Sequence, residues 1–151
     1  MAATDQSTQT PIHPPVKGFE PYPMHEGEEY MNPAQQDHFR VILQAWKREL
    51  MEEVDRTLHH MQDEAANFPD PNDRASQESD FSLELRTRDR ERKLLKKIDE
   101  ALAALDAGDY GYCEVSGEPI SLQRLEARPI ATMTLEAQER HERAEKVTRD
   151  E

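Results

Sequence analysis

Two aspartates, Asp70 and Asp73, lie in a short proline-containing segment between two long stretches of helical periodicity. A carboxylate presented at such a point can act through its charge on a metal ion or on basic groups brought near it. Aspartate just before a helix is also a common N-cap, whose oxygen accepts a backbone N–H. The residues alone leave both roles open, and one side chain can serve both.

A basic strip follows these aspartates. Residues 74–97 contain eight basic and five acidic side chains, a local charge of +3, in a chain whose formal net charge is −13. A run of this kind is usually a solvated helix face. Because the rest of the chain then carries −16, the contrast in sign favours a docking surface or an anion site.

Cys113 is the only cysteine, which excludes an internal disulfide and a four-cysteine metal site. A lone cysteine is more often a small buried apolar residue than a reactive thiol, and a redox role stays open. The six histidines lack metal-ligand spacing, and the adjacent His59 and His60 of a helix point in different directions. We therefore predict no metal site and, without a nucleophile beside a base, no enzyme.

The composition favours an elongated protein, because 35% hydrophobic against 34% charged residues in 151 leaves little material for a thick core. The net charge of −13 argues against sequence-specific or general DNA binding, which relies on lysine and arginine. No segment approaches the roughly 20 apolar residues of a membrane span, and the N-terminus lacks the apolar core of a signal peptide. We expect a cytoplasmic, monomeric protein that makes no membrane contact.

Two long helices must position these residues. Residues 1–31, rich in proline and small polar side chains, predict a flexible arm that leads to a head. Asn32 and Pro33 form a helix start, with an N-cap before a proline at the first helical position. The prolines at 69 and 71 predict a turn, with a tip at 67–75. Between them an apolar stripe advances by three or four residues at a time: Phe39, Leu43, Trp46, Leu50, Val54, Leu58, Met61 and Ala65.

A second stripe after the turn predicts the partner helix, ending near Gly108. The two stripes indicate a mainly α fold, a long antiparallel two-helix coiled-coil hairpin over residues 32–108. A glycine-rich segment then predicts a small α/β head over 109–134, followed by a C-terminal helix over 135–151. The second stripe consists of Phe81, Leu85, Arg88, Arg92, Leu95, Ile98, Leu102 and Leu105. Because two of these positions are arginines, we expect looser packing in the middle of the hairpin.

Four segments, 27–32, 61–71, 88–94 and 124–129, closely resemble the DksA family of bacterial RNA polymerase-binding transcription factors, and the likeness extends over residues 25–146. The resemblance implies a regulator that binds the polymerase through its secondary channel and modulates promoter-complex stability and initiation. It also implies action with guanosine tetraphosphate (ppGpp) in the stringent response. By resemblance, Asp70, Asp73 and Ala75 form the tip that reaches the active centre, Arg90 docks on the polymerase, and Lys97 and Arg128 contact ppGpp.

The chain departs from the common family pattern at the zinc site. Where such members have two Cys-x-x-Cys pairs separated by 17 residues, the four positions read Cys113, Ser116, Thr134 and Ala137. Hydroxyls are poor zinc ligands and alanine is none. We expect a degenerate zinc-finger-like head that needs no zinc and holds by packing and hydrogen bonds. Gln138 replaces the family's third phosphate-contacting residue, a lysine, which predicts a weaker response to ppGpp.

Two alternatives remain on the sequence alone. One is a transcript-cleavage or anti-cleavage factor that uses the same channel, which stimulated RNA cleavage in a stalled complex would reveal. The other is a coiled-coil adaptor without polymerase contact, which a failure to co-purify with core polymerase would reveal.

Overall fold

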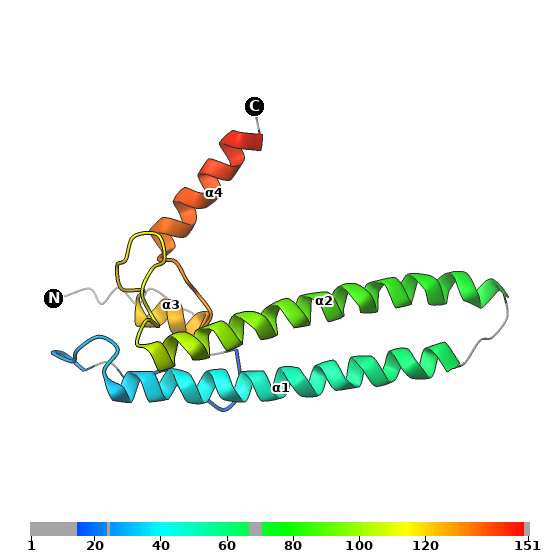
Figure 1. Cartoon of the computed structure of the whole chain (residues 1–151), viewed down its shortest axis with the longest axis horizontal. Helices are drawn as coiled ribbons and strands as arrows, with labels where there is room; N and C mark the ends of the chain where they lie inside the picture. The colour runs from blue at the N-terminus through cyan, green and yellow to red at the C-terminus, as the bar shows by residue number, and fades with distance from the viewer. Residues whose placement is uncertain (1–14, 24, 67–70, 150–151) are drawn as a thin grey trace, which may run out of the picture.

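The computed structural model describes residues 15–23, 25–66 and 71–149, with the backbone alone at 65, 66, 71–77 and 149. Two long helices, α1 (Pro33–Ala66) and α2 (Pro71–Ala107), lie side by side along the long axis of the molecule (Figure 1). Asn32 caps α1 as predicted, because its Oδ1 accepts the Gln35 backbone N–H at 2.8 Å. The predicted antiparallel helical hairpin is confirmed.

The predicted apolar face of α1 is also confirmed. Phe39 and Leu43 are fully buried and Leu50 and Met61 nearly so, each on the side of α1 that meets α2. The burial is densest where the head covers the base of the hairpin. There the same core includes Ile98 and Leu105 from α2 and Ile120 and Leu125 from the head.

The predicted seam of α2 is wrong in its distal half. Arg88 and Arg92 are exposed, and Phe81 and Leu85 are 40% and 42% exposed. The residues turned inward recur every seven positions, as a coiled-coil seam requires, and they are Glu84, Glu91, Ile98 and Leu105. Ile98 and Leu105 belong to both the expected stripe and this seam, but in the distal half Leu85 and Arg92 lie one position beyond Glu84 and Glu91. The arginines therefore stay in water, where their charge is solvated.

The middle of the hairpin is therefore polar, but through carboxylates rather than arginines. Burial raises the pKa of Glu91, helped by the charge of Glu53 and opposed by a hydrogen bond with Thr57. Nearer the base, Lys47 pairs with Asp99 across the helices at 2.7 Å. Both partners of that pair are well exposed, so it contributes at most about 1 kcal/mol.

The head is formed by a loop, the short helix α3 (Leu122–Ala127) and helix α4 (Leu135–Arg149). An α/β head was predicted, yet within the described residues the β pairing consists of one isolated antiparallel bridge, between Tyr112 and Pro119. Backbone hydrogen bonds such as Ile120 N–H to Gly111 O at 2.7 Å hold the loop without an extended strand. Helix α4 points away from the hairpin, and its residues 139–148 are exposed (Figure 1).

The segment before α1 is tied to the head. The Tyr22 backbone N–H donates to Glu126 Oε1 at 2.7 Å, and His38 Nε2 of α1 lies 2.7 Å from the same oxygen. Val16 and Met31 are buried. The arm expected to be flexible thus packs along its described part, while residues 1–14 lie outside the described residues. None of the described helices has the length and apolar character needed to cross a membrane.

Candidate functional site

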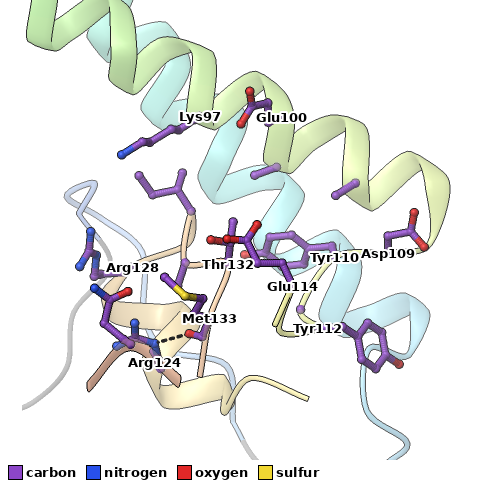
Figure 2. Close-up of a pocket in the computed structure, with 16 residues that line it drawn as sticks. Lys97, Glu100, Asp109, Tyr110, Tyr112, Glu114, Arg124, Arg128, Thr132 and Met133 are labelled. Atoms are coloured by element: carbon purple, nitrogen blue, oxygen red, sulfur yellow. Dashed lines mark hydrogen bonds between the residues drawn. The ribbon is translucent and has the colours of Figure 1, made fainter. Parts of the chain in front are cut away.

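A pocket of about 480 Å³ opens where the base of α2 meets the head. It brings together three residues that the family resemblance had singled out from distant parts of the chain, Lys97, Arg128 and Gln138. Arg124 adds a third basic side chain to its lining. Figure 2 shows Lys97, Arg124 and Arg128 on one side of the pocket, and Asp109 and Tyr112 on the other.

Two tyrosines hold the part of the lining formed by Tyr110 and Gly111, which we call the floor of the pocket. Tyr110 is buried and Tyr30 is half-buried. The Tyr110 hydroxyl donates to Pro129 O at 2.7 Å, which joins the end of α2 to the loop that carries Arg128. The Tyr30 hydroxyl is hydrogen-bonded to Gly111 O at 2.6 Å and also contacts Ile120 O. Burial raises the pKa of both phenols, so they remain protonated donors throughout the physiological range.

The pocket can bind an anion at its basic side. Lys97 and Arg128 are exposed side chains on the lining, and convergent cations are what a phosphate needs for charge-assisted hydrogen bonds. Arg124 is partly engaged, because its Nε donates to Met133 O at 2.8 Å. Gln138 brings no charge, and its amide donates to Glu142 Oε1 at 3.1 Å.

Acidic side chains limit how far an anion can extend into the pocket. Glu100, Asp109 and Glu114 also line it, and their charge disfavours a phosphate beside them. Reasoning from the sequence missed these three residues, because no spacing rule links the end of a helix to the loop after it. Arg124 could have been found from the sequence, because it is the first residue of segment 124–129, which resembles the family.

The four positions of the family's zinc site remain neighbours. Cys113 and Ala137 are buried in one apolar cluster. Thr134 has become a helix cap, because its Oγ1 accepts the Ala137 N–H at 3.2 Å at the start of α4. Ser116 is hydrogen-bonded to the Cys113 thiol. One thiol, two hydroxyls and a methyl group do not make the donor set of a four-cysteine zinc site.

The Cys113 thiol keeps the hydrogen-bonded surroundings of a metal-binding sulfur. Burial raises its pKa, but hydrogen bonds with the Ser116 side chain and with the backbone of Ser116, Thr134 and Val115 outweigh that effect and lower the pKa to about 6. Cys113 is 3% exposed. A low pKa favours the thiolate while burial restricts its access to reagents.

The structure does not bring the predicted tip to this pocket. Asp70 lies outside the described residues, and Asp73 and Ala75 fall on the first turns of α2, where only the backbone is described. Arg90 is exposed on α2 between the tip and the pocket. At the helical rise per residue, Asp73 lies about 36 Å along α2 from Lys97. Asp73, Arg90 and Lys97 therefore occupy separate regions along α2.

Two family profiles match consecutive parts of the chain, one over the hairpin and one over the head. Residues 35–105 match the N-terminal domain of DnaK suppressor protein DksA. Residues 108–143 match the prokaryotic dksA/traR C4-type zinc finger, although this chain retains one of the four cysteines.

Curated relatives agree with these profiles. The RNA polymerase-binding transcription factor DksA of Escherichia coli strain K12 is 60% identical over 121 residues, 80% of each chain. The protein of the same name from Caulobacter vibrioides is 57% identical over 126 residues, 83% of this chain and 89% of its own. Among solved structures, transcription factor DksA2 from Pseudomonas aeruginosa matches with a TM-score of 0.74 and 44% identity, covering 78% of this chain and 90% of its own. The chain belongs to the DksA family.

Proposed function

We propose that this chain binds RNA polymerase through the secondary channel and modulates promoter-complex stability and initiation. The observation that carries the proposal is the 60% identity over 121 residues, 80% of each chain, to a relative named an RNA polymerase-binding transcription factor. The hairpin suits the role, because α1 and α2 have 34 and 37 residues and so extend about 50 Å, long enough to reach into a deep channel.

Each part of the hairpin has a proposed role. Asp70, Asp73 and Ala75 act at the active centre, where carboxylate charge perturbs the magnesium site and its basic neighbours. Arg90 docks on the polymerase from the shaft, and its exposure on α2 leaves the guanidinium available to an acidic partner surface. A substitution at the tip should therefore change activity without changing affinity, and a substitution on the shaft should change affinity.

The pocket between α2 and the head is the proposed ppGpp site. Lys97 and Arg128 supply cations for the phosphates on its basic side. Gln138 leaves that side one charge short of the family's pattern, so we propose that the response to ppGpp is present but reduced.

The head is proposed to function without zinc. Its loop is closed instead by the Cys113–Ser116 hydrogen bond, the Thr134 cap on α4 and the buried methyl of Ala137. We propose a regulator with no catalytic activity of its own, acting as a cytoplasmic monomer and contacting polymerase rather than DNA.

A purified transcription assay on a ribosomal-type promoter, with and without ppGpp, tests the proposal. The expected result is that the chain shortens the lifetime of the promoter complex, and more so with ppGpp. Binding to core polymerase measured in parallel separates this function from that of an adaptor without polymerase contact. Stimulated cleavage of the transcript in a stalled complex, with no effect at the promoter, would support the cleavage-factor alternative.

A further inference from the structure

A cluster of potential metal ligands lies in the distal part of the hairpin, away from the pocket and the head. His60 and Glu64 come from α1 and Glu84 comes from α2. One ligand atom from each of the three residues lies within 4.8 Å of the other two. We call these three residues the His60 cluster.

His60 is in or near contact with both carboxylates of the cluster. His60 Nδ1 lies 2.5 Å from Glu84 Oε1 across the two helices. His60 Nε2 lies 3.6 Å from Glu64 Oε1, one helical turn along α1. The carboxylates are the better buried members, with side chains 20% exposed for Glu84 and 31% for Glu64.

Glu84 has an unused ligand atom in this arrangement. Its second oxygen, Oε2, is buried and accepts no hydrogen bond from any described residue. A buried carboxylate oxygen without a partner is costly, because that oxygen loses its hydration and forms no hydrogen bond in its place. A cation beside Glu84 would remove that cost. The cluster also borders a shallow hollow lined by Arg56, Thr57 and Thr87, so that solvent can reach it.

We propose that the His60 cluster binds a divalent first-row transition-metal ion, with His60, Glu64 and Glu84 as its protein ligands. One imidazole and two carboxylates suit ions such as Zn²⁺, Mn²⁺ and Fe²⁺. Ligand atoms of a tetrahedral ion lie about 3.4 Å apart at bonds of about 2.1 Å, which short side-chain rotations achieve from the present positions. Water completes the coordination on the exposed side.

The ion links the two helices. His60 is six residues from the end of α1, so the bound ion lies about 9 Å before the helix ends. An ion held by both helices stabilises their pairing in the stretch where the seam is polar and apolar contacts are few. The site is independent of the zinc-finger positions, none of which belongs to it.

The competing explanation needs no metal. A protonated His60 between the two carboxylates would form a charged bridge of its own. The two explanations differ in what happens when metal is supplied, and in what Glu84→Gln does to metal affinity.

The test begins with the full chain freed of metal by a chelator and titrated with Zn²⁺ by calorimetry, and with Co²⁺ by visible absorption. One ion is expected per chain, with a d–d absorption of bound Co²⁺ and a rise in the thermal midpoint of unfolding. Glu84→Gln and His60→Ala are each expected to lower the affinity by at least about tenfold, because even the outer-shell partners of metal ligands commonly contribute ten- to a hundredfold.

His141→Ala provides the matched control. His141 and Glu145 on α4 also form an i,i+4 pair, at 3.2 Å, and no third carboxylate is grouped with them among the described residues. The substitution should leave the affinity unchanged. Equal binding by the wild type and Glu84→Gln, or a heat of binding that disappears in His141→Ala, would overturn the proposal. Unchanged circular dichroism of the metal-free variants shows that any loss is not a loss of folding.

Discussion

Replacing Gly111 with alanine tests how the floor of the pocket is built. Gly111 is buried with φ +91°, and a Cβ added there would lie 2.7 Å from the Tyr30 hydroxyl oxygen and 2.9 Å from the terminal methyl of Met31. Those distances are below van der Waals contact, so Tyr30 must move away from the carbonyls of Gly111 and Ile120 to which it is hydrogen-bonded.

Gly117→Ala is the matched control. Gly117 also has a positive φ, +73°, but a Cβ there meets nothing within 4 Å. Alanine at either position incurs the strain of a left-handed backbone, about 1 to 2 kcal/mol, partly offset by the lower entropy of the unfolded chain. Only Gly111→Ala adds overpacking of about 1 kcal/mol or more and the loss of a buried hydrogen bond of similar size.

The free energy of unfolding of Gly111→Ala should therefore fall at least about 2 kcal/mol further than that of Gly117→Ala. Denaturation in urea, followed by circular dichroism, measures the difference. Equal losses in the two variants would refute the conclusion that the Tyr30 hydroxyl packs closely against Gly111 and stabilises the fold through its hydrogen bonds there.

Three further results are expected. Prolonged chelation should leave helical content and head structure intact, as seen by circular dichroism, because the proposed head needs no zinc at Cys113, Ser116, Thr134 and Ala137; unfolding of the head on chelation would contradict this. The pKa of Cys113 is about 6 in the folded chain against an ordinary 9.0, so between about pH 6 and 9 the thiol is deprotonated in the folded state and protonated in the unfolded state. The free energy of unfolding should therefore rise with pH across this window. That rise should be absent in Cys113→Ala, and parallel pH profiles of the two proteins would count against the low pKa. Gln138→Lys should lower, and Lys97→Ala raise, the ppGpp concentration needed for half-maximal promoter inhibition, since a charge-assisted hydrogen bond contributes about 1.5 to 3 kcal/mol; three superimposable curves would show that the pocket is not used.

The sequence was sufficient for the hairpin because its main signals are local. Asn32 and Pro33 mark the start of α1, and the stripe through Phe39, Leu43 and Leu50 lies on the buried face. The seam of α2 was misplaced because leucines occur both in the seam, as Leu105, and beside it, as Leu95 and Leu102. Apolar periodicity alone cannot tell these two rows of residues apart. Glu84 and Glu91 occupy the inward heptad positions, against the ordinary preference of carboxylates for water.

The site was only partly predictable. Lys97, Arg128 and Gln138 were identified from the family resemblance, and the structure places them on one pocket. The acidic lining of that pocket and the buried Glu126 contacted by His38 depend on tertiary packing, which no spacing reveals. The His60 cluster was missed for the same reason, because its third member is 24 residues away across the turn.

The tip is proposed to act inside RNA polymerase while the shaft and head supply affinity. The most direct test compares the wild type with Asp73→Asn at saturating concentration, measuring the half-life of a ribosomal-type promoter complex and the affinity for core polymerase. The prediction is that Asp73→Asn binds with nearly unchanged affinity and no longer shortens the half-life. A parallel loss of binding and activity would mean that Asp73 serves the structure of α2 and would contradict its proposed role at the active centre.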